Sequence, residues 1–237
     1  MSRNNFFYYL LKINRKKILL SLISLMLLNM SVFYNNTINE VTNISLIRML
    51  SNILGSPTSF ITVCIFLLNM NSWHFSNYVV SRFNNRKIFF RFLLLLILLR
   101  TTAFLVLSIL TTILTAVILK PDMFMNSLQI VNKNEIMQII FLLVGWLLIL
   151  FIVQLIILMF ELISPIYGTL IGSAVVLLIL FNDIYDSFSI LFIQAISSTF
   201  DYSLYTLFYN RLYLLIVIVF LTLICLKLTK SFQMLRR

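Results

Sequence analysis

The chain has 237 residues, of which 61% are hydrophobic and 11% are charged, and its formal net charge is +11. A water-soluble domain of this length could not shield so much apolar surface, so the composition excludes a soluble globular protein. The positive charge lies in short clusters beside apolar segments and forms no continuous stripe. This pattern argues against nucleic acid as a partner and favours contact with the anionic headgroups of membrane lipids.

The basic residues divide the chain into inner and outer segments. Thirteen of the eighteen Lys and Arg residues fall in three clusters: Arg3, Lys12, Arg15, Lys16 and Lys17; Arg82, Arg86, Lys87 and Arg91; and Lys227, Lys230, Arg236 and Arg237. Six of the seven carboxylates lie in other gaps between apolar runs. Short loops that flank membrane helices keep Lys and Arg on the cytoplasmic side. The alternation therefore predicts a multi-pass protein of the cell membrane with both termini in the cytoplasm.

The predicted elements begin with residues 3–17, an amphipathic interfacial helix with Phe6 and Tyr9 on one face and Lys12 and Arg15 on another. Six apolar segments follow, each close to the roughly 17 to 25 residues that a helix needs to cross the hydrocarbon core. They are Ile18–Tyr34, Phe60–Val80, Phe92–Leu119, Met137–Phe160, Ile166–Asn182 and Leu212–Thr229. The sequence thus predicts an all-α membrane protein, a single domain of residues 1–237 with six transmembrane helices.

The inner half of the second segment is polar. Asn69, Ser72, Trp73 and Ser76 recur at helical spacing and share one face. Lipid tolerates such a face poorly, so it should meet another helix, another subunit or water. Two interpretations stay open: hydrogen bonding between helices, and the lining of a substrate path.

The loop of residues 82–91 joins the second and third predicted helices on the inner side. Its polar residues are Arg82, Asn84, Asn85, Arg86, Lys87 and Arg91, with aromatic residues among them. One interpretation is a positive-inside anchor whose Phe89 and Phe90 lie in the interface. The other is a docking element for a cytoplasmic partner.

Arg100 is the only basic residue well inside a predicted helix. The segment Phe92–Leu119 would be about 42 Å long as a helix, roughly 12 Å more than the hydrocarbon core requires. The helix is therefore expected to start below the membrane, with Arg100 reaching the inner headgroups. The alternative is a charge that faces the bundle interior and pairs with an anionic substrate or with Glu161.

Gln154 and Glu161 lie seven residues apart on one face of the fourth predicted helix. Gln154 is a further candidate for the substrate path. Glu161 begins a tight inner turn whose Pro165 and Gly168 should end one helix and start the next. It is expected to be a solvated carboxylate; the alternative is a second contact with a cytoplasmic motor.

Residues 183–211 contain Ile190–Ile193, an apolar run too short to cross a membrane, among several aromatic residues. The segment is expected to lie in the outer interface or to enter it as a re-entrant hairpin, with its aromatic rings at headgroup level. Asp183 and Asp186 are expected to be exposed outer charges.

No catalytic motif is present. His74 is the only histidine, which excludes a His-Glu-x-x-His metal site, and Cys64 lies ten residues from it on the same predicted helix. There is no phosphate-binding Gly-x-x-x-x-Gly-Lys-Ser/Thr loop, and the chain has four glycines in all. The chain is therefore expected to be no enzyme and to bind no metal or cofactor itself.

The order of these elements resembles the membrane subunit of type-2 ABC exporters. Those permeases have an amphipathic elbow helix, six spans, a short basic coupling helix after the second span and an external hairpin before the sixth. Residues 3–17, 82–91 and 183–211 match these parts in order, although the external segment lacks the proline that this hairpin often carries. Arg82-x-x-x-Arg86-Lys87 followed by aromatics is similar to the family's coupling segment.

The resemblance implies an exporter of peptides or other amphipathic substrates. ATP and Mg²⁺ would be bound by a separate cytoplasmic ATPase subunit that docks on residues 82–91. A second permease chain, identical or a sister, would complete the path as a dimer. The most similar subfamily handles antimicrobial peptides and lantibiotics in the plasma membrane of low-GC Gram-positive bacteria.

A different class of function is also open. The chain could be a non-transporting immunity protein that binds a toxin at the outer face through residues 183–211. An ATPase gene beside its own favours the exporter, and protection by the chain alone favours the immunity protein.

Overall fold

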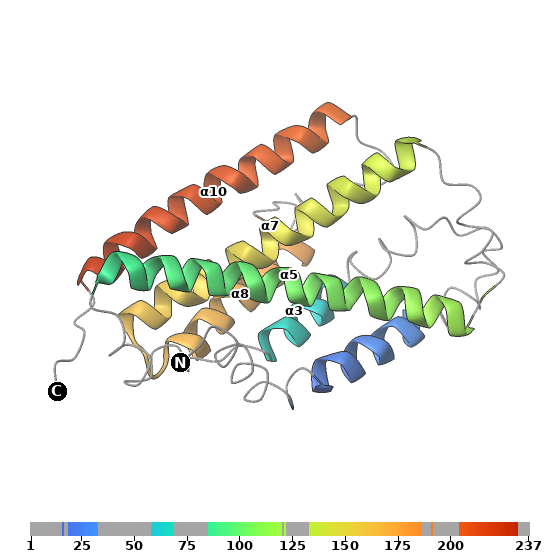
Figure 1. The fold of residues 1–237 in the computed structure, drawn as a ribbon, viewed down its shortest axis with the longest axis horizontal. Helices are drawn as coiled ribbons and strands as arrows, with labels where there is room; N and C mark the ends of the chain where they lie inside the picture. The colour runs from blue at the N-terminus through green and yellow to red at the C-terminus, as the bar shows by residue number, and fades with distance from the viewer. Residues whose placement is uncertain are drawn as a thin grey trace.

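The computed structural model describes residues 16, 19–32, 58–68, 85–119, 121, 133–185, 191 and 204–231 (Figure 1). These residues contain six helices and no β-strand. The helices are Leu19–Val32, α3 (Thr58–Leu68), α5 (Arg86–Leu119), α7 (Lys133–Ile163), α8 (Gly168–Tyr185) and α10 (Leu204–Ser231). Each overlaps one of the predicted spans, in the same order, so the all-α prediction is confirmed for this part of the chain.

Three of these helices are long and apolar enough to cross a membrane: α5, Ile136–Ile163 of α7 and Phe208–Lys230 of α10. Leu19–Val32 and Gly168–Asp183 are apolar but shorter, and α3 has only 11 residues. Six crossings therefore remain a prediction. The predicted elbow helix, residues 3–17, lies outside the described residues except for Lys16, which is exposed.

α7 is the central helix of the described bundle. It packs against α10, α8 and α5 (Figure 1). In the 18-residue apolar stretch of α7, 61% is buried inside the protein, against 39% in the corresponding stretch of α5 and 17% in that of α10. Its side chains form the middle of a core in which Trp146 and Ile149 join Phe66 of α3 and Phe104 of α5. The rings of Phe66 and Phe104 pack with their centroids 4.9 Å apart and their planes tilted by 58°.

A second apolar cluster lies where α5 begins and where α7 and α10 end. Phe89 and Leu93 of α5 pack there with Leu158 of α7 and Cys225 of α10. The Cys225 thiol is free and buried, and it donates to the carbonyl of Leu155 over 3.6 Å.

The turn between α7 and α8 has the predicted form. α7 ends at Ile163, Pro165 follows, and Gly168 starts α8 with its N–H donating to the Ser164 carbonyl over 2.7 Å. A Cβ on Gly168 would lie 2.4 Å from the carbonyl oxygen of Phe160. The two helices can therefore pack closely only because this residue has no side chain.

The largest differences from the predicted helix starts are at α5 and α10. α5 begins at Arg86 rather than at Phe92, and its 34 residues span about 51 Å, well beyond the roughly 30 Å hydrocarbon core. α10 begins at Leu204 rather than at Leu212, so the last part of the segment 183–211 is helical. Neither extension contains proline or glycine, and nothing in these residues interrupts the helix.

Candidate functional site

α5 begins inside the predicted docking segment. The side chain of Asn85 accepts a hydrogen bond from the N–H of Lys87 over 2.9 Å, and its carbonyl accepts one from the N–H of Phe89 over 3.0 Å. An asparagine in this position is a helix N-cap, which explains why the helix starts there. Arg86, Lys87 and Arg91 are exposed. The other two residues predicted for docking, at positions 82 and 84, lie outside the described residues.

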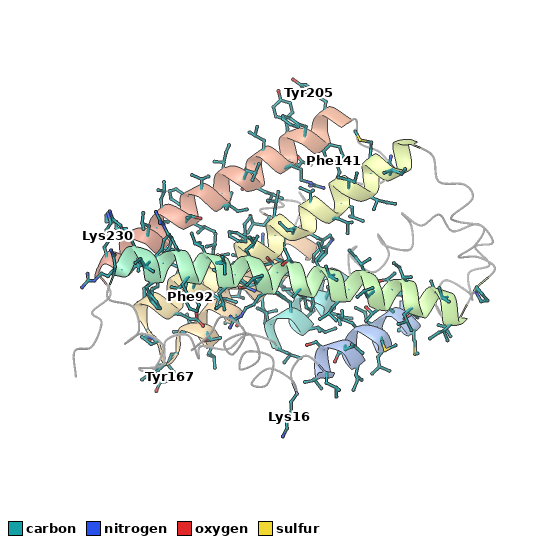
Figure 2. All side chains as sticks on the ribbon, viewed as in Figure 1. Lys16, Phe92, Phe141, Tyr167, Tyr205 and Lys230 are labelled. Carbon is teal, nitrogen blue, oxygen red and sulfur yellow. The ribbon has the colours of Figure 1, made fainter. Side chains whose placement is uncertain are left out.

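The end of α10 lies beside the start of α5. Nη1 of Arg86 donates to the backbone carbonyl of Lys230, and Lys227 and Lys230 are exposed (Figure 2). The contact brings described residues of two of the basic clusters to one end of the bundle. We call Arg86, Lys87, Arg91, Lys227 and Lys230 the basic end.

The opposite end of α10 is aromatic. Tyr205, Phe208, Tyr209 and Tyr213 are exposed, and Figure 2 shows Tyr205 at the far end of the helix from Lys230. The hydroxyl oxygens of Tyr205 and Tyr209 lie 2.7 Å apart, and their rings meet edge to face with centroids 4.6 Å apart. Aromatic residues at one end and lysines at the other are typical of a helix that runs between two membrane interfaces.

Arg100 and Glu161 interact electrostatically across α5 and α7. Glu161 is 3% exposed, and its Oε1 accepts a hydrogen bond from Oγ1 of Thr169 in α8 over 2.7 Å. The expectation of a solvated carboxylate at position 161 is therefore wrong. A cation and a hydroxyl beside the carboxylate reduce the cost of removing it from water. This interaction favours the second interpretation of Arg100, a charge that faces the bundle.

Asp183 is also buried, contrary to the expectation of an exposed outer charge. Its side chain has no exposed surface, and its Oδ2 accepts a hydrogen bond from the backbone N–H of Leu191 over 2.8 Å. The carboxylate thus ties the end of α8 to the segment that follows it. Asp186 lies outside the described residues.

Arg211 is a buried cation that the sequence analysis missed. It is 5% exposed, and its Nε donates to the carbonyl of Phe141 in α7 over 3.1 Å. Its guanidinium lies against Gly145, where a Cβ would come within 2.7 Å of Cζ. A lone glycine in a long apolar helix was the available signal, since it makes room for a large group from a neighbour.

Gln154 is 3% exposed, within α7, and its Nε2 has no hydrogen-bond partner. Trp146 Nε1 and both side-chain amide atoms of Asn29 are unpartnered as well, within the described helices. Such groups are rare in folded proteins, so a polar path through the bundle would explain them. The remaining predicted path residues, Asn69, Ser72, Trp73 and Ser76, lie outside the described residues.

The chain matches no protein-family model, no curated protein and no solved structure. The geometry of the described residues is what bears on the function of the chain. That geometry has three parts: an exposed basic end, a buried interaction that joins α5, α7 and α8, and unpartnered amides in the core.

Proposed function

We propose that the chain is the membrane-spanning permease subunit of an ATP-driven ABC exporter. A separate cytoplasmic ATPase binds residues 82–91 and supplies the energy. One observation carries the proposal: the exposed basic segment is the first part of α5 itself, capped by Asn85. A partner that displaces this segment moves a 34-residue helix with it, because no loop intervenes to absorb the motion.

Two sets of contacts can transmit a displacement of α5 to the other helices. At the basic end, the hydrogen bond from Arg86 to the Lys230 carbonyl couples α5 to α10. Farther along α5, the interaction of Arg100 with Glu161, and that of Glu161 with Thr169, couple it to α7 and α8. Binding and release of ATP by the partner would thus rock the helices as one body.

The finer parts of the proposal follow the resemblance. Six helices cross the plasma membrane with both termini in the cytoplasm, residues 3–17 form the elbow, and a second permease chain completes a dimer. The substrate is a peptide or another amphipathic molecule. Its path uses the polar inner half of the second span together with Gln154, whose unpartnered amide supports a polar interior. ATP and Mg²⁺ stay on the partner.

The test is co-purification of the tagged chain with an ATPase from membranes of the source cell in mild detergent. The variant Arg86→Glu/Lys87→Glu is compared with Arg86→Lys/Lys87→Arg, which keeps both charges. We expect the glutamate pair to abolish recovery of the ATPase and the conservative pair to retain it. Equal recovery with both variants, at equal permease yield and elution volume, would reject the docking role.

A second experiment distinguishes an exporter from an immunity protein. A toxin-sensitive cell expresses the chain with or without its ATPase. We expect protection or export to require both proteins, and full protection by the chain alone would favour the immunity protein.

A further inference from the structure

The exposed face of α10 is apolar in its middle and positively charged near its C-terminal end. Val219, Phe220 and Leu223 are each more than half exposed, and Lys227 and Lys230 continue the same face toward the basic end. Positions 220, 223, 227 and 230 recur at helical spacing. An apolar strip thus runs directly into a pair of ammonium groups.

The counter-charge for these lysines does not come from the two helices that meet there. Neither α5 nor α10 contains an aspartate or a glutamate. The guanidinium of Arg86 adds a third positive charge beside Lys230. Glu161, the buried carboxylate of α7, already interacts with Arg100 and Thr169. Among the described residues, no carboxylate is thus left to pair with these lysines, and the face is complementary to an anionic ligand.

We propose that this face binds an anionic phospholipid. Lys227 and Lys230 hold its phosphate, and its acyl chain lies along Leu223, Phe220 and Val219. The seven steps along the helix from Phe220 to Lys227 correspond to a rise of about 10 Å, which fits the upper part of an acyl chain below its headgroup. A free phosphate would use the lysines alone and would leave the apolar strip without a role. The inference concerns α10 and does not rest on the proposed ATPase.

Native mass spectrometry of the purified full chain tests the proposal. The protein in detergent is titrated with phosphatidylglycerol or with phosphatidylcholine of the same acyl chains. We expect a preference for phosphatidylglycerol that Lys227→Gln/Lys230→Gln reduces about tenfold, because each lysine near an anionic surface contributes appreciably to binding. Lys227→Arg/Lys230→Arg should keep the preference.

Three outcomes would overturn the proposal. The first is equal binding of both lipids by the wild type. The second is an unchanged preference in the glutamine variant, at the same elution volume as the wild type. The third is competition by glycerol 3-phosphate at the same concentration as the lipid, which would mean that the acyl chain contributes nothing. Loss of ATPase recovery with unchanged lipid preference would assign the lysines to a protein partner instead.

Discussion

α7 and α10 are both long, apolar helices, yet they occupy different places in the molecule. The apolar 18-residue stretch of α7 is 61% buried inside the protein, and that of α10 only 17%. Lipid tails are as apolar as leucine, so hydrophobicity alone does not decide which helix enters the core. Among the described helices, α7 contacts α5, α8 and α10 and seats Arg211 of α10 over Gly145, whereas α10 packs mainly against α7 and exposes large aliphatic side chains on its other face.

The largest expected effect comes from breaking the polar contacts of α7. Glu161→Gln removes the negative charge that interacts with Arg100, and we expect it to destabilise the protein by about 3 kcal/mol, because a charge in the bundle loses its counterpart. Unfolding of the purified protein in detergent measures this. Thr169→Val removes one hydrogen bond and should cost about 1 kcal/mol. Equal stability of Glu161→Gln and wild type would contradict the role of this interaction.

A matched pair of leucines compares the two helices directly. Leu150 of α7 is 1% exposed, and Leu223 of α10 is 58% exposed. We expect Leu150→Ala to cost about 2 kcal/mol because it leaves a cavity, and Leu223→Ala to cost less than about 0.5 kcal/mol. Unfolding of the purified variants in detergent measures both losses. A similar loss in both variants would mean that another part of the protein covers α10.

The close packing of α7 against α8 predicts a smaller effect. A Cβ on Gly172 would lie 2.8 Å from Cα of Ile157, so Gly172→Ala must push two backbones apart and should cost about 1 to 2 kcal/mol. Ala174→Ser, at an exposed position two residues away, is the control and should be neutral. Thermal unfolding that does not separate the two variants would show that the helices can move apart freely.

The smallest effect is expected at the aromatic end of α10. Tyr205→Phe removes a hydroxyl that pairs with Tyr209 at an exposed position, and we expect less than about 0.5 kcal/mol of change. The fraction of this variant that inserts into vesicles on reconstitution should equal that of the wild type. A large loss of stability would show that the pair belongs to a buried contact.

The sequence predicted what depends on local pattern. The positions of the described helices followed from apolar runs, and the turn between α7 and α8 followed from Pro165 and Gly168. The start of α5 at Arg86 was missed because apolar length marked only the membrane-crossing part, whereas the cap at Asn85 sets the true beginning.

The polar interior could not be predicted in the same way. Burial of Asp183 depends on the backbone N–H of Leu191, and burial of Glu161 depends on Arg100 and Thr169 from other helices. Arg211 is buried because Gly145 faces it across two helices. The contacts of Arg100 with Glu161 and of Arg211 with Gly145 join residues far apart in the chain, so the sequence could offer the first only as one alternative and did not predict the second.

In the proposed topology, the start of α5 and the end of α10 share the cytoplasmic face, and the aromatic end of α10 lies outside. Single cysteines at Lys87, Lys230 and Tyr205, in a chain without Cys64 and Cys225, can be labelled with a membrane-impermeant maleimide. Intact cells should label only Tyr205→Cys, and permeabilised cells all three. Labelling of Lys87→Cys and Lys230→Cys from opposite sides of the membrane would contradict this topology and the proposed docking of a cytoplasmic ATPase.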